Sequence, residues 1–113
     1  MGQVQVQVRA TFRGPDGTTP VGGQVEFRLT EPLRDPDENE ILAASLVVTP
    51  VDPGTGVMAA VSLVANDSPN CVPTNTRYWV TTKITGAAPH TRRILVPAAA
   101  AAAGLDLPDA PDA

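Results

Sequence analysis

The chain has 113 residues, with 12 prolines, nine glycines and a formal net charge of −4. A chain of this length has room for one domain with a single modest core, and its acidic balance without a basic stripe argues against binding to a nucleic-acid backbone. The prolines and glycines are spread along the chain, so they divide it into short elements and leave no long window for helices.

Three features bear on where the chain is made and kept. No apolar stretch approaches the roughly 20 residues of a membrane span. The first six residues lack the basic start and the apolar run of a signal peptide. Cys71 is the single cysteine, which rules out an internal disulfide. We therefore expect a chain that is synthesised in a reducing cytoplasm and has no membrane partner.

The first predicted strand covers residues 3–12, where apolar and polar side chains alternate with a period of two. Its apolar face carries Val4, Val6, Val8, Ala10 and Phe12. This pattern predicts a half-buried strand with one wet face. Residues 14–17, Gly-Pro-Asp-Gly, predict a turn. The alternation returns at Val25, Phe27 and Leu29, which predicts a second half-buried strand.

The middle of the chain predicts two more strands. After a polar excursion over residues 31–40, residues 41–49 predict a third strand, and residues 57–63 predict a fourth beyond a proline-rich turn at 50–56. The side chains expected to point inward are Leu42, Ala44, Leu46 and Val48 in the third strand and Val57, Ala59, Val61 and Leu63 in the fourth. Residues 41–46 would also fit a helical turn.

A polar corner and a fifth strand follow, and the strand holds the only tyrosine and the only tryptophan. Pro69 and Pro73 keep the corner outside a sheet, because proline cannot donate to a ladder. In the fifth strand, residues 77–84, we expect Tyr78 to point inward because the residues that share its face are apolar. Trp79 then points outward, and the reversed register is the alternative.

A sixth strand is predicted over residues 91–96. Six to seven short strands separated by turns, without helical periodicity, predict an all-β fold, either an antiparallel β-sandwich or a small barrel. The alternation favours antiparallel pairing, since parallel strands are buried on both faces and show continuous apolar runs. We expect the sandwich domain to span residues 1–97.

Residues 98–113 form an Ala/Pro/Asp-rich C-terminal arm. Pro97, six alanines and Gly104 follow in the order of a helix start, a helix and a cap, but a helix of fewer than two turns is marginal in water. The arm is either a flexible tail or an extended segment that docks on a neighbouring subunit through Leu105 and Leu107.

The chain offers little for catalysis or metal binding. Residues 35–40 begin like a calcium loop, D-x-D-x-N, but Glu40 and Leu46 stand where the loop needs Gly and Glu. A solvated acidic loop is therefore the favoured interpretation. His90 is the single histidine, and it could serve Cys71 as a base only if the fold joined two loops. We expect no catalysis, no metal and no cofactor.

Five residues are candidates for contacts between subunits: Trp79, Leu105, Leu107, Val4 and Val6. An outward tryptophan on a sheet is a common anchor of protein interfaces. The strand that carries the two valines has neither Lys nor Pro to protect a free edge, so we expect it to be internal to a sheet or paired with another chain.

Three segments resemble a β-sandwich family, immunoglobulin-like or transthyretin-like, found in structural proteins of actinobacterial phages. They are residues 14–27, with GPDG and VGGQVEF, residues 65–80, with AND and PTNTRYWV, and residues 93–97, RILVP. The resemblance covers about residues 8–107. Asn75 stands where the family usually has Gly, a substitution that the left-handed backbone region tolerates.

The resemblance implies a non-enzymatic virion protein. Tail-fibre relatives continue into long repeats beyond this domain, which favours a capsid decoration protein over a fibre. Such a protein would bind neighbouring capsid or tail subunits and form a homo-oligomer in the virion. The alternative is a tail-associated or cell-surface immunoglobulin-like module that binds a host receptor or a carbohydrate.

Overall fold

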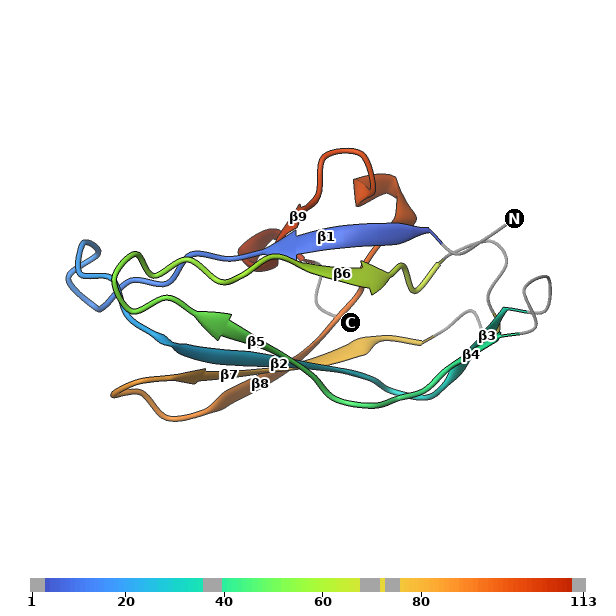
Figure 1. Cartoon of the computed structure of the whole chain (residues 1–113), viewed down its shortest axis with the longest axis horizontal. Helices are drawn as coiled ribbons and strands as arrows, with labels where there is room; N and C mark the ends of the chain where they lie inside the picture. Colours follow the sequence, from blue (N-terminus) through green and yellow to red (C-terminus); the bar gives the residue numbers. More distant parts are fainter. Residues whose placement is uncertain (1–3, 36–39, 68–71, 73–75, 111–113) are drawn as a thin grey trace.

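A computed structural model of the chain describes residues 4–35, 40–67, 72 and 76–110 (Figure 1). Its strands over these residues are β1 (Gln5–Arg9), β2 (Gly23–Leu29), β3 (Leu33–Asp35), β4 (Glu40–Leu42), β5 (Val47–Val51), β6 (Val61–Val64), β7 (Tyr78–Ile84), β8 (His90–Ile94) and β9 (Leu105–Asp106). Two short 3-10 helices follow β8, η1 (Ala98–Ala100) and η2 (Leu107–Asp109). No helix within the described ranges has the length and apolar character needed to cross a membrane.

The strands form two facing layers (Figure 1). One sheet has the order β6-β1-β9, the other has the order β5-β2-β7-β8, and the β3–β4 hairpin extends one end of the molecule. Neighbouring strands are antiparallel except for the parallel pair β1–β9. The expected all-β, sandwich-like character is confirmed. The described strands outnumber the six to seven expected, because the predicted third strand is split and the short strands β3 and β9 were not predicted.

The core lies between the two layers and follows the alternation of the long strands. On β1, Val6 and Val8 are fully buried and the residues between them are exposed. On β2, Val25 and Phe27 are fully buried in the same way. Both half-buried strands predicted in the first 30 residues are therefore confirmed, although the first is shorter than the predicted residues 3–12 and ends at Arg9.

The orientation of β7 is also as predicted. Tyr78 is 4% exposed and packs in the core, whereas Trp79 is 42% exposed. The Tyr78 hydroxyl donates a hydrogen bond of 2.7 Å to the carbonyl oxygen of Val64 on β6, so this side chain links the two layers. Residues 68–71 and 73–75 of the polar corner that precedes β7, including Pro69 and Pro73, lie outside the described residues.

The prediction for the third strand is wrong in its extent and its register. Residues 40–42 pair with β3, whereas residues 47–51 pair with β2. Leu46 and Val48, expected to face inward, are 51% and 48% exposed, and Val51 is buried instead. The physical reason is that β5 is an edge strand that continues through Pro50, which an edge tolerates because no donor is needed there. The predicted turn therefore begins two residues too early.

Residues 56–59 pass from one sheet to the other and close this side of the sandwich. Their main chain makes hydrogen bonds on both sides, from Phe12 N to Gly56 O (2.7 Å), from Met58 N to Ala10 O (2.9 Å) and from Ala59 N to Pro50 O (3.0 Å). Met58 is buried while Val57 and Ala59 are exposed. The predicted inward set is thus wrong at Val57 and Ala59, because a segment that serves two sheets follows no single alternation, and right at Leu63.

The C-terminal arm docks on the chain that carries it. Leu105, Leu107 and Ala110 are buried in the same core as the two sheets, and β9 adds a parallel strand to β1. Arg92 on β8 donates hydrogen bonds to the carbonyl oxygens of Leu107 (3.3 Å) and Ala110 (2.7 Å). The alanine run forms one 3-10 turn, η1, instead of an α-helix.

Candidate interaction surface

The side of the four-stranded sheet that faces away from the core forms a broad surface, which we call the outer face. The register of the strands places these side chains on it: Val48 and Pro50 from β5, Gln24, Glu26 and Arg28 from β2, Trp79, Thr81 and Lys83 from β7, and Thr91 and Arg93 from β8. Their neighbours in sequence point into the core, because successive side chains of a strand alternate between the two faces.

Trp79 lies at the centre of one row of this face, between two arginines. The register aligns Arg28 of β2, Trp79 of β7 and Arg93 of β8. The Arg93 guanidinium carbon lies 5.7 Å from the centroid of the Trp79 ring, which is within the range of a cation–π contact. Arg28 donates its Nε hydrogen to the carbonyl oxygen of Ala44 at 3.2 Å. Both arginines are thus held close to the sheet beside an exposed aromatic ring.

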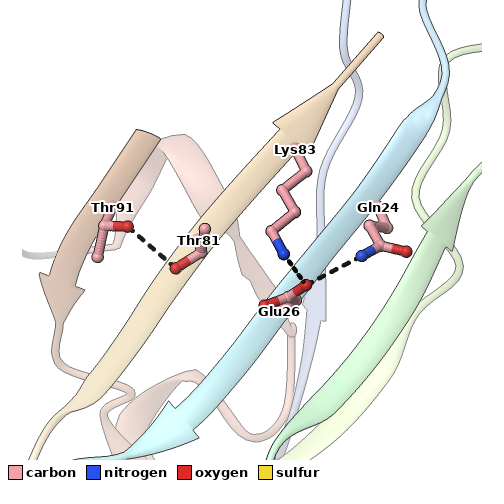
Figure 2. Close-up of polar contacts among 5 residues, drawn as sticks. All are labelled: Gln24, Glu26, Thr81, Lys83 and Thr91. Carbon is pink, nitrogen blue, oxygen red and sulfur yellow. Dashed lines mark hydrogen bonds and ion pairs between the residues drawn. The ribbon is translucent and has the colours of Figure 1, made fainter. Parts of the chain in front are cut away.

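Polar contacts connect the side chains of the neighbouring rows on the outer face (Figure 2). Lys83 Nζ lies 2.7 Å from Glu26 Oε2, and Gln24 Nε2 donates to the same oxygen at 2.9 Å. The ammonium of Lys83 is the main reason why the pKa of Glu26 is lowered, and partial desolvation opposes it. The hydroxyls of Thr81 and Thr91 join β7 to β8 at 3.0 Å. Glu26 therefore stays ionised at neutral pH, and the ammonium of Lys83 balances its charge.

The outer face is more basic than the rest of the molecule. It carries three cations, Arg28, Lys83 and Arg93, against the single carboxylate of Glu26, although the chain as a whole has a charge of −4. Since Glu26 is paired with Lys83, the two arginines beside Trp79 dominate the local potential. The arrangement can attract an acidic partner surface and bury an aromatic ring against it.

An apolar strip borders this face along β5. The consecutive residues Leu46, Val47 and Val48 are all exposed, and Ile41 on β4 is also exposed. The sequence prediction placed Leu46 and Val48 in the core. The uninterrupted apolar triplet was a signal against this prediction, because it does not show the alternation of apolar and polar residues that marks a half-buried strand.

The five predicted interface residues differ in how far their side chains are buried. Trp79 is exposed on the outer face. Val6, Leu105 and Leu107 are buried in the chain's own core, and Val4 is partly buried against it. Three of these side chains are buried by intramolecular packing and Val4 is covered in part, so Trp79 is the most exposed of the five. Its partners Arg28 and Arg93 were missed, although both could have been found once the strand register was known.

Two pockets are formed by the described residues near β1 and the C-terminal arm. One of about 300 Å³ is lined by Phe12, Thr82, His90 and Arg92 together with small and apolar residues. Its Arg92 guanidinium is bound by the carbonyls of the arm. A second pocket of about 760 Å³ is lined in part by Arg9 and Asp106, which form an ion pair at 3.4 Å.

The predictions for Cys71 and for the acidic loop concern parts of the chain that lie outside the described residues. This applies to Cys71, whose pairing with His90 was considered and not expected, and to residues 36–39. Within the described ranges, no three His, Cys, Asp or Glu side chains are grouped closely enough to hold a metal ion. Comparisons of the chain with protein-family models, with curated proteins and with solved structures found no match.

Proposed function

We propose that this chain is a non-enzymatic structural protein of a phage virion, decorating the capsid by binding neighbouring protein subunits through its outer face. The observation that carries the proposal is the row Arg28–Trp79–Arg93 on the outer face of the four-stranded sheet, where Trp79 is exposed. Tryptophan and arginine are the residues most enriched at the energetic centres of protein interfaces. The resemblance of three sequence segments to phage structural proteins supplies the biological setting.

The chemistry of the outer face defines the partner. An exposed indole contributes a large apolar area and one N–H donor, and the flanking guanidinium groups favour carboxylates. The complementary surface on a neighbour is therefore an apolar recess bordered by Asp or Glu. Such an interface is steered by charge, so its association rate falls as the salt concentration rises.

The closer identity of the sandwich, immunoglobulin-like or transthyretin-like, belongs to the same proposal. Its support is the strand order: β5-β2-β7-β8 faces β6-β1-β9, so strands distant in sequence are neighbours within each layer. In immunoglobulin-like sandwiches, Greek-key connections between two antiparallel sheets produce this kind of interleaving. We expect no cofactor, because a decoration protein acts through contacts alone.

A second candidate function is a tail-associated or cell-surface module that binds a host receptor or carbohydrate. Trp79 favours it, since an indole ring exposed among Thr81, Lys83 and other polar side chains can stack on a sugar ring. In the first function a protein surface covers Trp79, and in the second function a sugar ring covers it. Because Trp79 is the only tryptophan in the chain, its fluorescence reports directly on which ligand covers it.

The test begins with virus particles purified from the source of this sequence. A decoration protein is expected at a copy number comparable with that of the major capsid protein, and a tail component at only a few copies per particle, as quantified by mass spectrometry. Purified chain is then added back to shells from which it has been removed. Absence of the chain from the particles would overturn the virion assignment.

Two variants locate the binding surface. Trp79→Ala is expected to weaken rebinding by about 30-fold, the effect of losing one central interface residue. Gln5→Ala, an exposed side chain on the other sheet, is the matched control and should rebind like wild type. Equal rebinding of both variants would show that the outer face is not the docking surface. Quenching of Trp79 by a glycan, without binding to shells, would favour the second function.

A further inference from the structure

No strand within the described residues pairs with the outward edge of β5 over its first half. Ala59 N donates to Pro50 O, and Asp52 N donates to Val57 O, so residues 50 and 52 direct their main chain away from β2. Successive residues of a strand direct these groups to opposite sides, which means that Val48 also directs its N–H and C=O outward. The strand pairing of Val48 is with Glu26 of β2 on the other side. Residues 56–59 cover only the second half of this edge.

This half of the edge lacks the features that usually keep sheet edges apart. Native proteins protect free edges with charges, prolines or bulges, but residues 41–49 contain no charged residue and no proline. The exposed side chains there are Leu46, Val47 and Val48. Pro50 interrupts the edge only at its far end.

We propose that this edge is the interface between two copies of the chain, paired antiparallel about a two-fold axis at Val47. In this register Leu46 of each copy lies opposite Val48 of the other, and β5 is extended by one residue. The outward N–H and C=O groups of both residues then form four main-chain hydrogen bonds across the seam. Pro50 ends the ladder, because it has no N–H and its carbonyl is already bonded to Ala59.

The self-complementarity of the edge is the reason for assigning it to a second copy. The two-fold axis gives every outward main-chain group in residues 46–48 a partner, and it places the exposed apolar side chains of one copy on those of the other. The two four-stranded sheets become one sheet, as the edge positions of β5 in Figure 1 allow.

The charges nearest the seam do not oppose this register. On one side of the seam the row contains Val48 and Glu26, and it continues into Leu46 and then Arg28 of the second copy. Unlike charges therefore face each other, at three strand spacings or about 14 Å. This distance exceeds the screening length of about 8 Å at physiological salt, so these charges contribute little to the register or to the affinity. Glu26 is also neutralised by Lys83, as Figure 2 shows.

This inference rests on the proposed function and gives a form to the homo-oligomer expected from the sequence, because the joined sheets present two Trp79 rows on one continuous face. A dimer that binds with both rows gains avidity over a single row. The seam is short compared with the roughly 800 Å² that each partner buries in a stable interface. We therefore expect a weak dimer that is populated at high protein concentration and dissociates on dilution.

The experiment measures the mass of the full chain by sedimentation equilibrium over a concentration series. Wild type should shift from monomer to dimer. Val48→Lys places two ammonium groups at the seam and should weaken dimerisation at least tenfold. Val57→Lys is the matched control, because Val57 has the same exposure as Val48, 48%, and lies outside β5; it should dimerise like wild type. Urea unfolding of dilute samples checks that both variants fold.

A cross-link tests the register. With Cys71 replaced by serine, Val47→Cys should oxidise to a covalent dimer, because residues facing each other across a non-hydrogen-bonded antiparallel pair have Cα atoms about 4.5 Å apart, within the range of a disulfide. Val57→Cys in the same background should stay monomeric. A chain that is monomeric at every concentration, or a dimer that Val48→Lys leaves intact, would overturn the proposal. Neither result depends on whether the chain is found in virus particles.

Discussion

Asn66 and Val96 bind each other reciprocally where the two sheets meet. The main-chain N–H of Asn66 donates to the carbonyl oxygen of Val96 at 2.9 Å, and the N–H of Val96 donates to Oδ1 of Asn66 at 2.8 Å. The Asn66 side chain also donates from Nδ2 to Thr76 Oγ1 at 3.3 Å. Asn66, Thr76 and Val96 are all buried. One side chain thus joins the end of β6, the start of β7 and the segment that follows β8.

Asn66→Ala should destabilise the fold by about 1–3 kcal/mol, because it leaves the buried N–H of Val96 without a partner. The change would be measured as a lower urea midpoint. Gln5→Ala on the exposed face of β1 is the control and should shift stability by less than about 0.5 kcal/mol. A loss for Asn66→Ala no larger than that of the control would show that the reciprocal pair contributes nothing.

The Tyr78 hydroxyl provides a second link between the layers, through its bond to Val64 O. Tyr78→Phe keeps the buried ring and removes this bond, so it should cost about 1 kcal/mol in the free energy of unfolding. Trp79→Phe alters the next residue, which is exposed, and should have a much smaller effect. Equal effects of the two substitutions on the urea midpoint would contradict the inter-sheet role of Tyr78.

The sequence predicted those strands whose two faces differ most in environment. The alternation at Val6, Val8, Val25 and Phe27 is visible because one face of these central strands is buried and the other is wet. At Leu46 and Val48 it fails, because an edge strand exposes apolar side chains on its outer face and continues through a proline. At Val57 it fails because the segment contacts both sheets.

The candidate surface was predicted in part for a related reason. The outward direction of Trp79 follows from the apolar character of its alternate neighbours, which is local information. The positions of Arg28 and Arg93 beside it depend on the pairing of β2, β7 and β8, and no local pattern specifies which residues meet across strands. The docking of Leu105 on the chain's own core is likewise a tertiary feature, since β9 has only two residues.

The turn at residues 14–17 should respond to acid. Asp16 accepts hydrogen bonds from the hydroxyl and N–H of Thr19 and from the N–H of Thr18, and these bonds, that of the Thr19 hydroxyl first, lower the pKa of Asp16 from 3.8 to about 2. A lowered pKa means that ionised Asp16 stabilises the fold above about pH 4. This stabilisation is lost as the pH falls from about 4 to 2.

Carboxyl chemical shifts measured by NMR would give the Asp16 pKa directly. Thr19→Val removes the hydroxyl that has the largest effect and should raise the pKa toward 3.8. Asp16→Asn should remove the corresponding part of the acid dependence of the urea midpoint. An Asp16 pKa that is the same in wild type and Thr19→Val would show that the hydroxyl does not hold the carboxylate.

The last prediction concerns the C-terminal arm. Whether the arm docks on its own chain or on a neighbouring subunit decides how it affects the stability of the fold. Leu107 is 5% exposed and packs with the cores of both sheets, so Leu107→Ala should cost about 2–5 kcal/mol. Since the arm docks on its own chain, this loss should be the same at every protein concentration. A flexible tail would give no loss, and an arm that docks on a neighbouring subunit would give a loss that grows with concentration. Ala102→Ser, at an exposed position of the same arm, is the control, and urea unfolding at two widely separated concentrations distinguishes the three arrangements.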